Sequence, residues 1–362
     1  MTKTQATQRI PAEIEYAEEL HQLKRWDPVT PPPGWQLSPQ AVEKFILGCS
    51  ELGIERKFVA DPGIVTRIVV ALCTHRGSLL VGEPGTAKSW LSELLTAAIS
   101  GDSSLIIQGG AVSSVSQLLY SWNQAILRQK GPCLEALVPS PLFRAMQQGK
   151  CVRFEELSRC PQPLQDATLS LLSDRVITIP ELSGEDGVLY ARHGFNVIAT
   201  ANSVDQGLHQ MSAALKRRLS FEHIRPIRQL DDEIAVVMQQ TAKLNQQAGI
   251  SLTLEPTPFE MLVTIFHELR NGQTVDGRST DRLAGAAMST AEAVSVAHTF
   301  CLHAWYYHQG EMKLTDLLHF MLGSALKDNP EDRRRLQHYF ETEVAEKPGN
   351  HWQQLYTVRH LI

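Results

Sequence analysis

The chain has 362 residues, of which 43% are hydrophobic and 20% charged, and this balance is typical of a folded protein with room for two domains rather than of a disordered or fibrous chain. The formal net charge of -5 excludes a global basic field that would draw the whole molecule to nucleic acid. Six cysteines form no CxxC pair, and the sequence shows neither an apolar signal region nor a stretch of ~20 apolar residues, so we expect reduced thiols, no membrane span and a cytoplasmic location.

Prolines mark the first segment, residues 1–38. The series Pro31, Pro32, Pro33 favours extended backbone, so we predict an N-terminal arm or linker, with a proline-rich ligand motif as the alternative. Ser38 followed by Pro39 is typical of a helix start, and we expect a helix from there through Glu51.

Between residues 61 and 224, short apolar runs alternate with helical patterns, which predicts an α/β domain with a parallel sheet between helices, residues 39–227. After Pro226 only helical spacing remains, over 231–246, 258–270, 281–297 and 314–326, and this predicts an all-helical lid with C-terminal helices, residues 228–362. The apolar runs are 78–81, 104–107, 151–154, 196–199 and 221–224.

The strongest local signal is a glycine-rich loop between an apolar strand and a helix. In this context backbone N–H groups and the helix N-terminus bind phosphate, while a lysine reaches the β- and γ-phosphates and a serine holds Mg²⁺. Alanine stands where the usual pattern has glycine, and it fits if that position has an ordinary negative φ. We therefore predict an ATP site with Mg²⁺ at Gly82, Glu83, Pro84, Gly85, Thr86, Ala87, Lys88 and Ser89.

Two acids end the run that begins at Cys151. Glu155 is the candidate that supports Mg²⁺ with Ser89, and Glu156 is the candidate that polarises the attacking water. Glutamate at position 155 replaces the usual aspartate, and Arg153 interrupts the apolar run. The alternative is a strand that merely ends in solvated carboxylates.

Asn202 ends the next apolar run and is a candidate to orient water against the γ-phosphate. A lone asparagine at a strand end is otherwise a turn former. Here its order after the acids favours the first interpretation.

The ordered set resembles the MoxR branch of AAA+ ATPases over roughly residues 60 to 290. The segments that carry the resemblance are the loop at 82–89, then SPLFRAMQQGKCVRFEELSR, NVIATANSVD and AALKRRL. It implies an AAA+ P-loop NTPase domain with a helical lid, hydrolysis of ATP and water to ADP and phosphate, and a homo-oligomeric ring, in general a hexamer. Asn202 is then similar to sensor 1.

The same resemblance assigns two arginines. Arg218 looks like the arginine finger that acts on the neighbouring subunit's ATP, with Arg217 as the alternative and a solvated helix end as the simpler interpretation. Arg282 looks like the lid sensor, sensor 2, at the start of a lid helix, with Arg278 as the alternative because Thr280 replaces a proline.

A hairpin is predicted between residues 175 and 193, where two strand-like runs flank a glycine-rich turn. It resembles the insertion before sensor 1 that projects toward the pore in this AAA+ group, and a plain surface hairpin is the alternative.

Histidines near residue 300 do not predict a metal site. Because steps of five residues on a helix turn about 140° beyond a full turn, His298, His303 and His308 do not share a face, and His298 with Cys301 offers too few ligands. The run Arg333 to Arg335 has acids on both sides, so we expect a solvated helix face rather than a nucleic-acid contact.

The sequence therefore predicts a MoxR-type ATPase that couples ATP hydrolysis to chaperone-like remodelling, or to metal-cofactor or complex assembly of a partner. By family resemblance the partner is a von Willebrand factor A domain protein. The alternatives are a low-turnover nucleotide-binding scaffold and a nucleic-acid remodelling AAA+ protein, the latter opposed by the acidic net charge.

Overall fold

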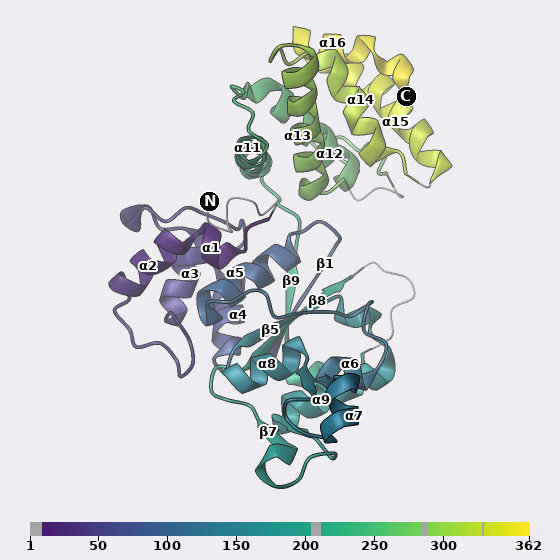
Figure 1. Cartoon of the computed structure of the whole chain (residues 1–362). Coiled ribbons are helices and arrows are strands. Elements are labelled where there is room, and N and C mark those ends of the chain that lie inside the picture. The colour runs from purple at the N-terminus through teal and green to yellow at the C-terminus, as the bar shows by residue number, and fades with distance from the viewer. Residues whose placement is uncertain (1–8, 204–210, 284–287, 328) are drawn as a thin grey trace. The chain divides into compact units, whose positions relative to one another are not determined.

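The computed structural model of the chain describes residues 9–203, 211–283, 288–327 and 329–362. The chain divides into two compact units. The first holds the described residues up to Gly82 together with Ala87–Ile224, and the second holds Glu83–Thr86 and Arg225–Ile362 (Figure 1). The domain limits 39–227 and 228–362 stay a prediction, and the division seen here falls after Ile224.

A five-stranded parallel sheet forms the centre of the first unit, in the order β2-β5-β8-β1-β9. This confirms the predicted fold class, and each predicted apolar run overlaps one strand. Strands β5 and β8 also include the polar residues that follow their runs, Glu155 and Asn202. The strands are β1 (Gly77–Gly82), β2 (Ile106–Gln108), β5 (Cys151–Glu155), β8 (Asn196–Asn202) and β9 (Leu219–Ile224).

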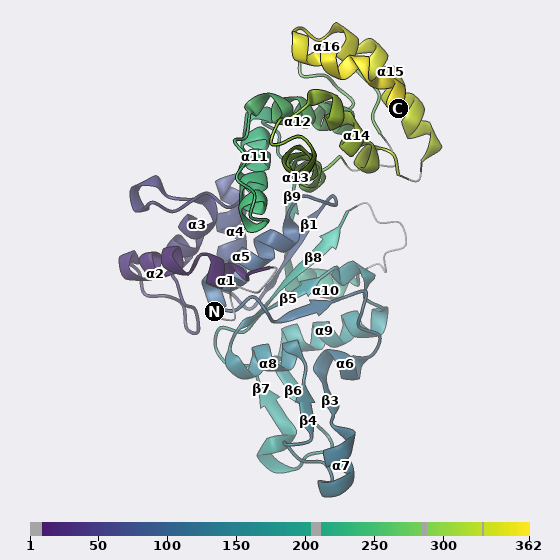
Figure 2. The same ribbon diagram turned by 45° about the horizontal axis from the view of Figure 1, so that its top comes forward.

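Helices cover both faces of this sheet (Figure 2). The described helices of the first unit are α1 (Ala12–Glu15), α2 (Ala17–Trp26), α3 (Pro39–Leu47), α4 (Pro62–Leu72), α5 (Lys88–Ser100), α6 (Val115–Leu119), α7 (Gln124–Lys130), α8 (Pro141–Gln148), α9 (Gln162–Asp174) and α10 (Ala213–Arg218). Short 3₁₀ turns lie at Ser50–Leu52, Leu157–Arg159 and Gly184–Gly187.

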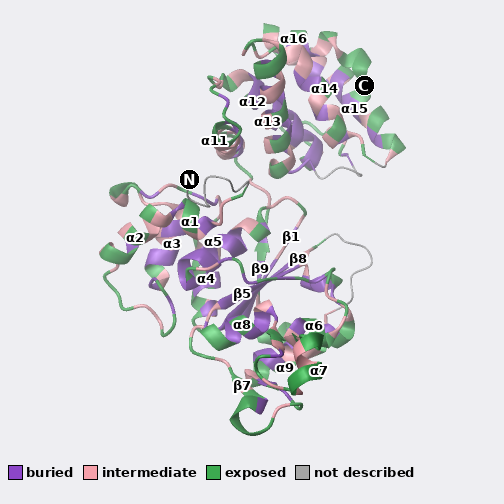
Figure 3. Ribbon diagram, viewed as in Figure 1, coloured by how far each residue is buried: buried purple, intermediate pink, exposed green. Residues whose placement is uncertain are grey.

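Successive strand residues enter two different cores, because side chains alternate across a sheet. Leu80 and Ile198 pack in the core shared with α3, α4 and α5, whereas Leu79 and Val197 pack in the core shared with α8 and α9. Figure 3 shows β5 and β8, the strands at the middle of the sheet, buried between these layers. The sheet is therefore fixed from both sides, and its carboxyl edge carries the loops that follow the strands.

The N-terminal segment is not the extended arm that we predicted. Helices α1 and α2 bury Tyr16 and Leu23 in the same core as Phe45 of α3. The spacing of Tyr16, Leu20 and Leu23 gives these helices an apolar face, and that face outweighs the prolines farther along. Ser38 caps α3 as predicted, accepting a hydrogen bond from the N–H of Ala41 over 3.3 Å.

Two hairpins extend from the first unit and lie side by side (Figure 2). The predicted one pairs β6 (Val176–Thr178) with β7 (Val188–Tyr190), and a second, unpredicted one pairs β3 (Tyr120–Trp122) with β4 (Leu137–Pro139). Glu181 joins them, because its carboxylate accepts from the Tyr120 hydroxyl over 2.9 Å and from the Trp122 indole over 3.4 Å.

In the second unit all the described secondary-structure elements are helices, as predicted. Its core gathers large apolar side chains, among them Phe259, Phe266, Phe300 and Phe340. The helices are α11 (Leu230–Gln247), α12 (Pro256–Asn271), α13 (Thr290–Tyr307), α14 (Leu314–Ala325), α15 (Pro330–Thr342) and α16 (Asn350–Thr357), with 3₁₀ turns at Val344–Glu346 and Arg359–Leu361. Within the described ranges, no helix combines the length and the apolar character needed to cross a membrane.

Helix α13 begins later than the predicted range of 281–297. Ser289 caps it, since its hydroxyl accepts from the N–H of Glu292 while the Glu292 carboxylate accepts from the N–H of Ser289. This capping box satisfies both backbone donors and sets the helix start at Thr290. Asp281 and Arg282 consequently lie outside any helix.

Candidate nucleotide-binding site

The predicted phosphate loop joins β1 to α5. Its strand ends at Gly82 and its helix begins at Lys88, as the motif requires. The Lys88 ammonium, 7% exposed, donates to the Gly82 carbonyl over 3.0 Å, and the Thr86 hydroxyl donates to the Glu83 carbonyl over 2.8 Å. The loop is therefore held by bonds between its own residues.

Ala87 does not have the negative φ under which alanine would fit without strain. Its φ is 59° and its ψ 28°, in the left-handed region, directly before Lys88. A side chain in this conformation costs roughly 1–2 kcal/mol, which glycine avoids. The departure from the usual motif thus leaves a strained residue in the loop.

Glu155 lies against the first turn of α5. One carboxylate oxygen accepts from the hydroxyls of Ser89 (2.6 Å) and Thr200 (2.7 Å), and the other accepts from the Ser92 hydroxyl (2.7 Å). The two residues predicted to support Mg²⁺, Ser89 and Glu155, are thereby brought together.

Arg153 shares a face of β5 with Glu155 because the two are two residues apart. Only 4% exposed, its guanidinium donates to Glu155 over 3.1 Å, to the Ser92 hydroxyl over 3.0 Å and to the Ser89 carbonyl over 2.9 Å. It also pairs with Glu93 of α5 over 3.4 Å. The basic residue that interrupts the apolar run is the counter-ion of two buried carboxylates.

These contacts keep Glu155 ionised. Burial by itself would raise the pKa of Glu155, but the hydrogen bonds from Ser89, Ser92 and Thr200, together with the charge of Arg153, outweigh it and hold that pKa below its usual value. A carboxylate that stays charged is what a cation-binding acid requires.

Glu156 occupies a different environment from its neighbour. It has φ 56° and ψ 46°, and its N–H donates to the Thr200 hydroxyl over 3.0 Å. Its carboxylate accepts from Gln108 over 3.4 Å and pairs with Arg159 over 3.5 Å, with 31% of the side chain exposed. The more exposed of the two acids is therefore the one predicted to act on water.

Asn202 ends β8 opposite Gly82 in the parallel register. The predicted sensor 1 residue therefore lies beside the start of the phosphate loop, and Glu155 ends β5, the strand on the other side of β8. The sheet brings these three chain segments to one edge.

Three residues of this network escaped the sequence analysis: Ser92, Glu93 and Thr200. Ser92 follows Ser89 by three residues on the same helix face, and Thr200 precedes Asn202 by two on the same strand face, so helix and strand periodicity point to both. Glu93 has no such local signal.

The candidate finger residues lie at the end of α10. Both Arg217 and Arg218 are exposed, and the Arg218 guanidinium donates to the Ser173 hydroxyl of α9 over 2.9 Å. Exposure is compatible with action on a neighbouring subunit, and which of the two acts stays a prediction.

The candidate lid sensors lie in the second unit. Arg282 is exposed and, against expectation, not part of a lid helix. Arg278 pairs with Glu343 over 3.0 Å and Glu346 over 3.3 Å, so its charge is balanced within its own unit.

Two family profiles match consecutive parts of the chain. The AAA domain (dynein-related subfamily) matches residues 77–219, and the YehL-like AAA+ ATPase C-terminal domain matches residues 231–362. The first match includes the phosphate loop, both acids and Asn202, and the second includes the helices of the second unit.

Known proteins share this arrangement to different extents. The uncharacterized protein YehL of Escherichia coli (strain K12) is 50% identical over 356 residues, 98% of each chain. The gas vesicle ATPase GvpN1 of Halobacterium salinarum (strain ATCC 700922 / JCM 11081 / NRC-1) is 26% identical over 174 residues, 48% of this chain and 47% of that protein.

Among solved structures, NtrX from Brucella abortus in complex with ADP superposes with a TM-score of 0.50 at 13% identity. The match covers 83% of this chain and 64% of that one, so this chain spans less than two thirds of that protein, and the likeness shows the fold alone. Together with the near full-length identity to YehL, the two profile matches confirm the resemblance: the chain belongs to the YehL-like AAA+ ATPases, in the dynein-related, MoxR-like group.

Proposed function

We propose that this AAA+ protein hydrolyses ATP at the edge of the sheet where Lys88, Ser89, Glu155 and Asn202 gather. The observation that carries the proposal is the contact of the Ser89 hydroxyl with the Glu155 carboxylate, 2.6 Å apart, directly after the phosphate loop. A structural strand end would not need an ionised, buried acid at that point.

The same pair fits Mg²⁺. A hydroxyl and a carboxylate are the oxygen donors that this ion prefers, and the ion usually keeps several waters and takes its other ligands from phosphates. Ser89 and Glu155 would hold it, and it would neutralise charge on the β- and γ-phosphates of bound ATP. Lys88 would add a second positive charge there.

Glu156 and Asn202 are proposed to act on the attacking water. Asn202 would orient the water against the γ-phosphate, and the partly exposed carboxylate of Glu156 would accept its proton. Arg218, or Arg217, would stabilise the transition state on the neighbouring subunit's ATP, and Arg282, or Arg278, would report hydrolysis to the helical unit.

We further propose that the motor works as a cytoplasmic homo-oligomeric ring, in the family a hexamer, and remodels a partner protein. The six free cysteines support a reducing compartment. The linked hairpins offer an element that could pass motion to a client, and the family resemblance suggests a von Willebrand factor A domain protein as partner. Chaperone-like action and metal-cofactor or complex assembly are the roles that this partner implies.

A low-turnover scaffold is the second candidate. The strained Ala87 and the enclosed hydrogen bonding of Glu155 favour it, because both depart from the usual site at the residues next to the metal and phosphates. Such a protein would bind ATP and assemble without cycling.

Assembly and client capture test the motor function. With ATP, the Glu156→Gln variant should form a ring and retain a client that wild type releases, while Lys88→Ala should do neither; size-exclusion chromatography with light scattering and pull-down measure both. An exposed substitution away from the site, Glu260→Gln, is the control. Identical behaviour of Glu156→Gln and wild type in ATP would contradict the proposal.

A further inference from the structure

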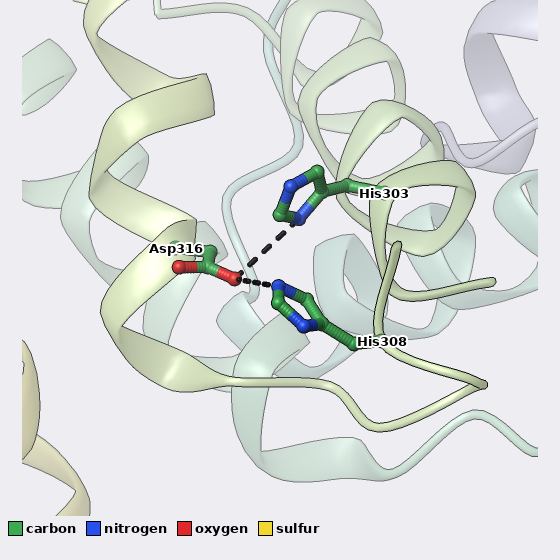
Figure 4. A group of neighbouring side chains, drawn as sticks. All are labelled: His303, His308 and Asp316. Atoms are coloured by element: carbon green, nitrogen blue, oxygen red, sulfur yellow. Dashed lines mark ion pairs between the residues drawn. The ribbon is translucent and has the colours of Figure 1, made fainter. Parts of the chain in front are cut away.

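A cluster of three ligand-type side chains lies in the second unit, far along the sequence from the nucleotide site. His303 belongs to α13, His308 follows the end of that helix, and Asp316 lies in the first turn of α14. Figure 4 shows both imidazole rings directed toward the Asp316 carboxylate.

The two distances from the imidazoles to the carboxylate match those between neighbouring ligands of a metal site. His303 Nδ1 lies 3.4 Å and His308 Nε2 lies 3.1 Å from the same oxygen of Asp316, Oδ2, and all three ligand atoms lie within 4.8 Å of one another. A tetrahedral site with bonds of about 2.0–2.2 Å places neighbouring ligand atoms roughly 3.3 Å apart. A small adjustment of the rings would bring all three onto one ion.

Hydrogen bonding does not account for this convergence. Among the described residues, His303 Nδ1 and Asp316 Oδ2 are buried atoms that make no hydrogen bond of acceptable geometry. Buried polar atoms are normally satisfied, and those that are not call for another partner. A cation between them would satisfy both atoms.

The end of α13 explains why sequence periodicity did not find the cluster. On a continuous helix a separation of five residues would turn His308 away from His303, but α13 ends at Tyr307. Gln309 and Gly310 then have φ values of 52° and 91°, and the N–H groups of His308 and Gly310 both donate to the Ala304 carbonyl. His308 is the C-cap of α13 and has left the helical conformation, with a φ of -127°, and its ring lies beside that of His303 with centroids 4.8 Å apart.

Aromatic side chains pack against the His303 ring. Tyr307 stacks on it with centroids 5.1 Å apart and Phe320 of α14 lies 4.9 Å away. The side chains of His303, His308 and Asp316 are 28%, 25% and 27% exposed, so the cluster lies close to the surface although two of its ligand atoms are buried.

We propose that His303, His308 and Asp316 bind a divalent transition-metal ion of the Zn²⁺ type. Two imidazole nitrogens and one carboxylate oxygen suit Zn²⁺ better than Mg²⁺ or Ca²⁺, which prefer oxygen ligands throughout. The ion ties the end of α13 to the start of α14, and three protein ligands leave a fourth position for water or a partner's side chain. This site is separate from the nucleotide site and does not depend on the proposed ATPase.

The test is Zn²⁺ titration of the full, untagged chain after chelator treatment, by calorimetry and thermal unfolding. Wild type should bind one Zn²⁺ per chain in the micromolar range or tighter and unfold at a higher temperature with it. His303→Gln and the near-isosteric Asp316→Asn should weaken binding at least about tenfold. His319→Gln, an exposed histidine of α14 outside the cluster, should bind as wild type does.

Co²⁺ supplies a readout that does not depend on the variants folding. Bound Co²⁺ should show visible bands of a nitrogen and oxygen site without thiolate charge transfer, although six cysteines are free. Three results would each overturn the proposal and leave the cluster as plain ion pairs. They are thiolate charge transfer in the Co²⁺ spectrum, equal binding by Asp316→Asn and wild type, and binding only at millimolar concentration, which would mean an adventitious ion only.

Discussion

At the scale of single residues, the guanidinium of Arg153 is buried between two acids, Glu93 of α5 and Glu155 of β5. Glu93 also accepts from Arg9 over 2.5 Å and from the N–H of Ala12 over 3.3 Å. A chain of contacts thus runs from the N-terminal helix α1 to the acid that faces Ser89.

Replacing the buried cation should affect both stability and the acid. In Arg153→Met the buried Glu155 carboxylate loses its counter-ion and Glu93 keeps only Arg9, so we expect the free energy of unfolding to fall by about 3–5 kcal/mol. The pKa of Glu155 should rise, because burial remains while the opposing charge is gone, and any ATP hydrolysis should shift to higher pH. Denaturant unfolding and a pH–rate profile measure these effects.

The matched control is Arg144→Met, an exposed arginine on α8. If Arg153→Met proved as stable as Arg144→Met, the buried ion pairs would have no role in the fold.

Replacing Ala87 should change the free energy of unfolding in the opposite direction. Ala87→Gly should raise the free energy of unfolding by about 0.5–1 kcal/mol, because relief of the left-handed strain exceeds the entropy cost of the extra glycine. Ala167→Gly, in the right-handed helix α9, should instead lower it by about 1 kcal/mol. Thermal unfolding compares the two, and equal losses in both variants would show that position 87 is not strained.

At the scale of elements, Glu233 of α11 links three helices of the second unit. Its carboxylate forms a two-pronged pair with Arg270 of α12, over 2.9 and 2.6 Å, and accepts from Thr290 of α13 over 2.6 Å. Burial alone would raise the pKa of Glu233, yet the bonds from His267, Arg270 and Thr290 and the Arg270 charge lower it to about 2.

This shift predicts acid sensitivity of the second unit. Because the folded pKa is lower than the unfolded value of 4.5, the contribution of Glu233 is fully present above pH 4.5 and is lost as the pH falls toward 2. Its size is on the order of 3 kcal/mol. Glu233→Gln should flatten this part of the stability–pH curve and destabilise the protein at pH 7, whereas the exposed Glu260→Gln should do neither. Stability–pH curves of the same shape for wild type and Glu233→Gln would contradict this role of Glu233.

Elements coded by local pattern were predicted well from sequence, and long-range pairing was not. The apolar runs and the loop at Gly82 have local signals, so all five strands and a helix after the loop were predicted. Arg153 and Glu93 form an ion pair although they lie 60 positions apart, and no sequence periodicity predicts this contact. His308 has left the helical conformation, with a φ of -127°, so helical periodicity does not predict that its ring lies beside His303.

At the scale of the whole molecule, the proposed arginine finger predicts that a site in one subunit depends on a residue of its neighbour. Arg218→Ala and Lys88→Ala should each be inactive alone, yet their mixture should regain part of the wild-type ATPase rate. The Lys88→Ala subunit would supply the arginine, and the Arg218→Ala subunit would bind the ATP.

Mixing Arg217→Ala with Lys88→Ala in the same way decides between the two arginines. Only the variant that lacks the finger should be inactive alone and regain ATPase activity in the mixture. Wild-type rates for both single arginine variants, or no recovery on mixing, would exclude action across a subunit interface at these positions.

The central claim is that the acids at the end of β5 turn a nucleotide-binding fold into an ATPase. Steady-state phosphate release from Mg²⁺ and ATP, compared among wild type, Lys88→Ala and Glu156→Gln, tests it most directly. We predict that wild type turns over, that Lys88→Ala neither binds nor hydrolyses, and that Glu156→Gln binds ATP with a rate at least about 100-fold lower. A wild type that binds ATP but releases phosphate no faster than Glu156→Gln would contradict the account and leave a nucleotide-binding scaffold.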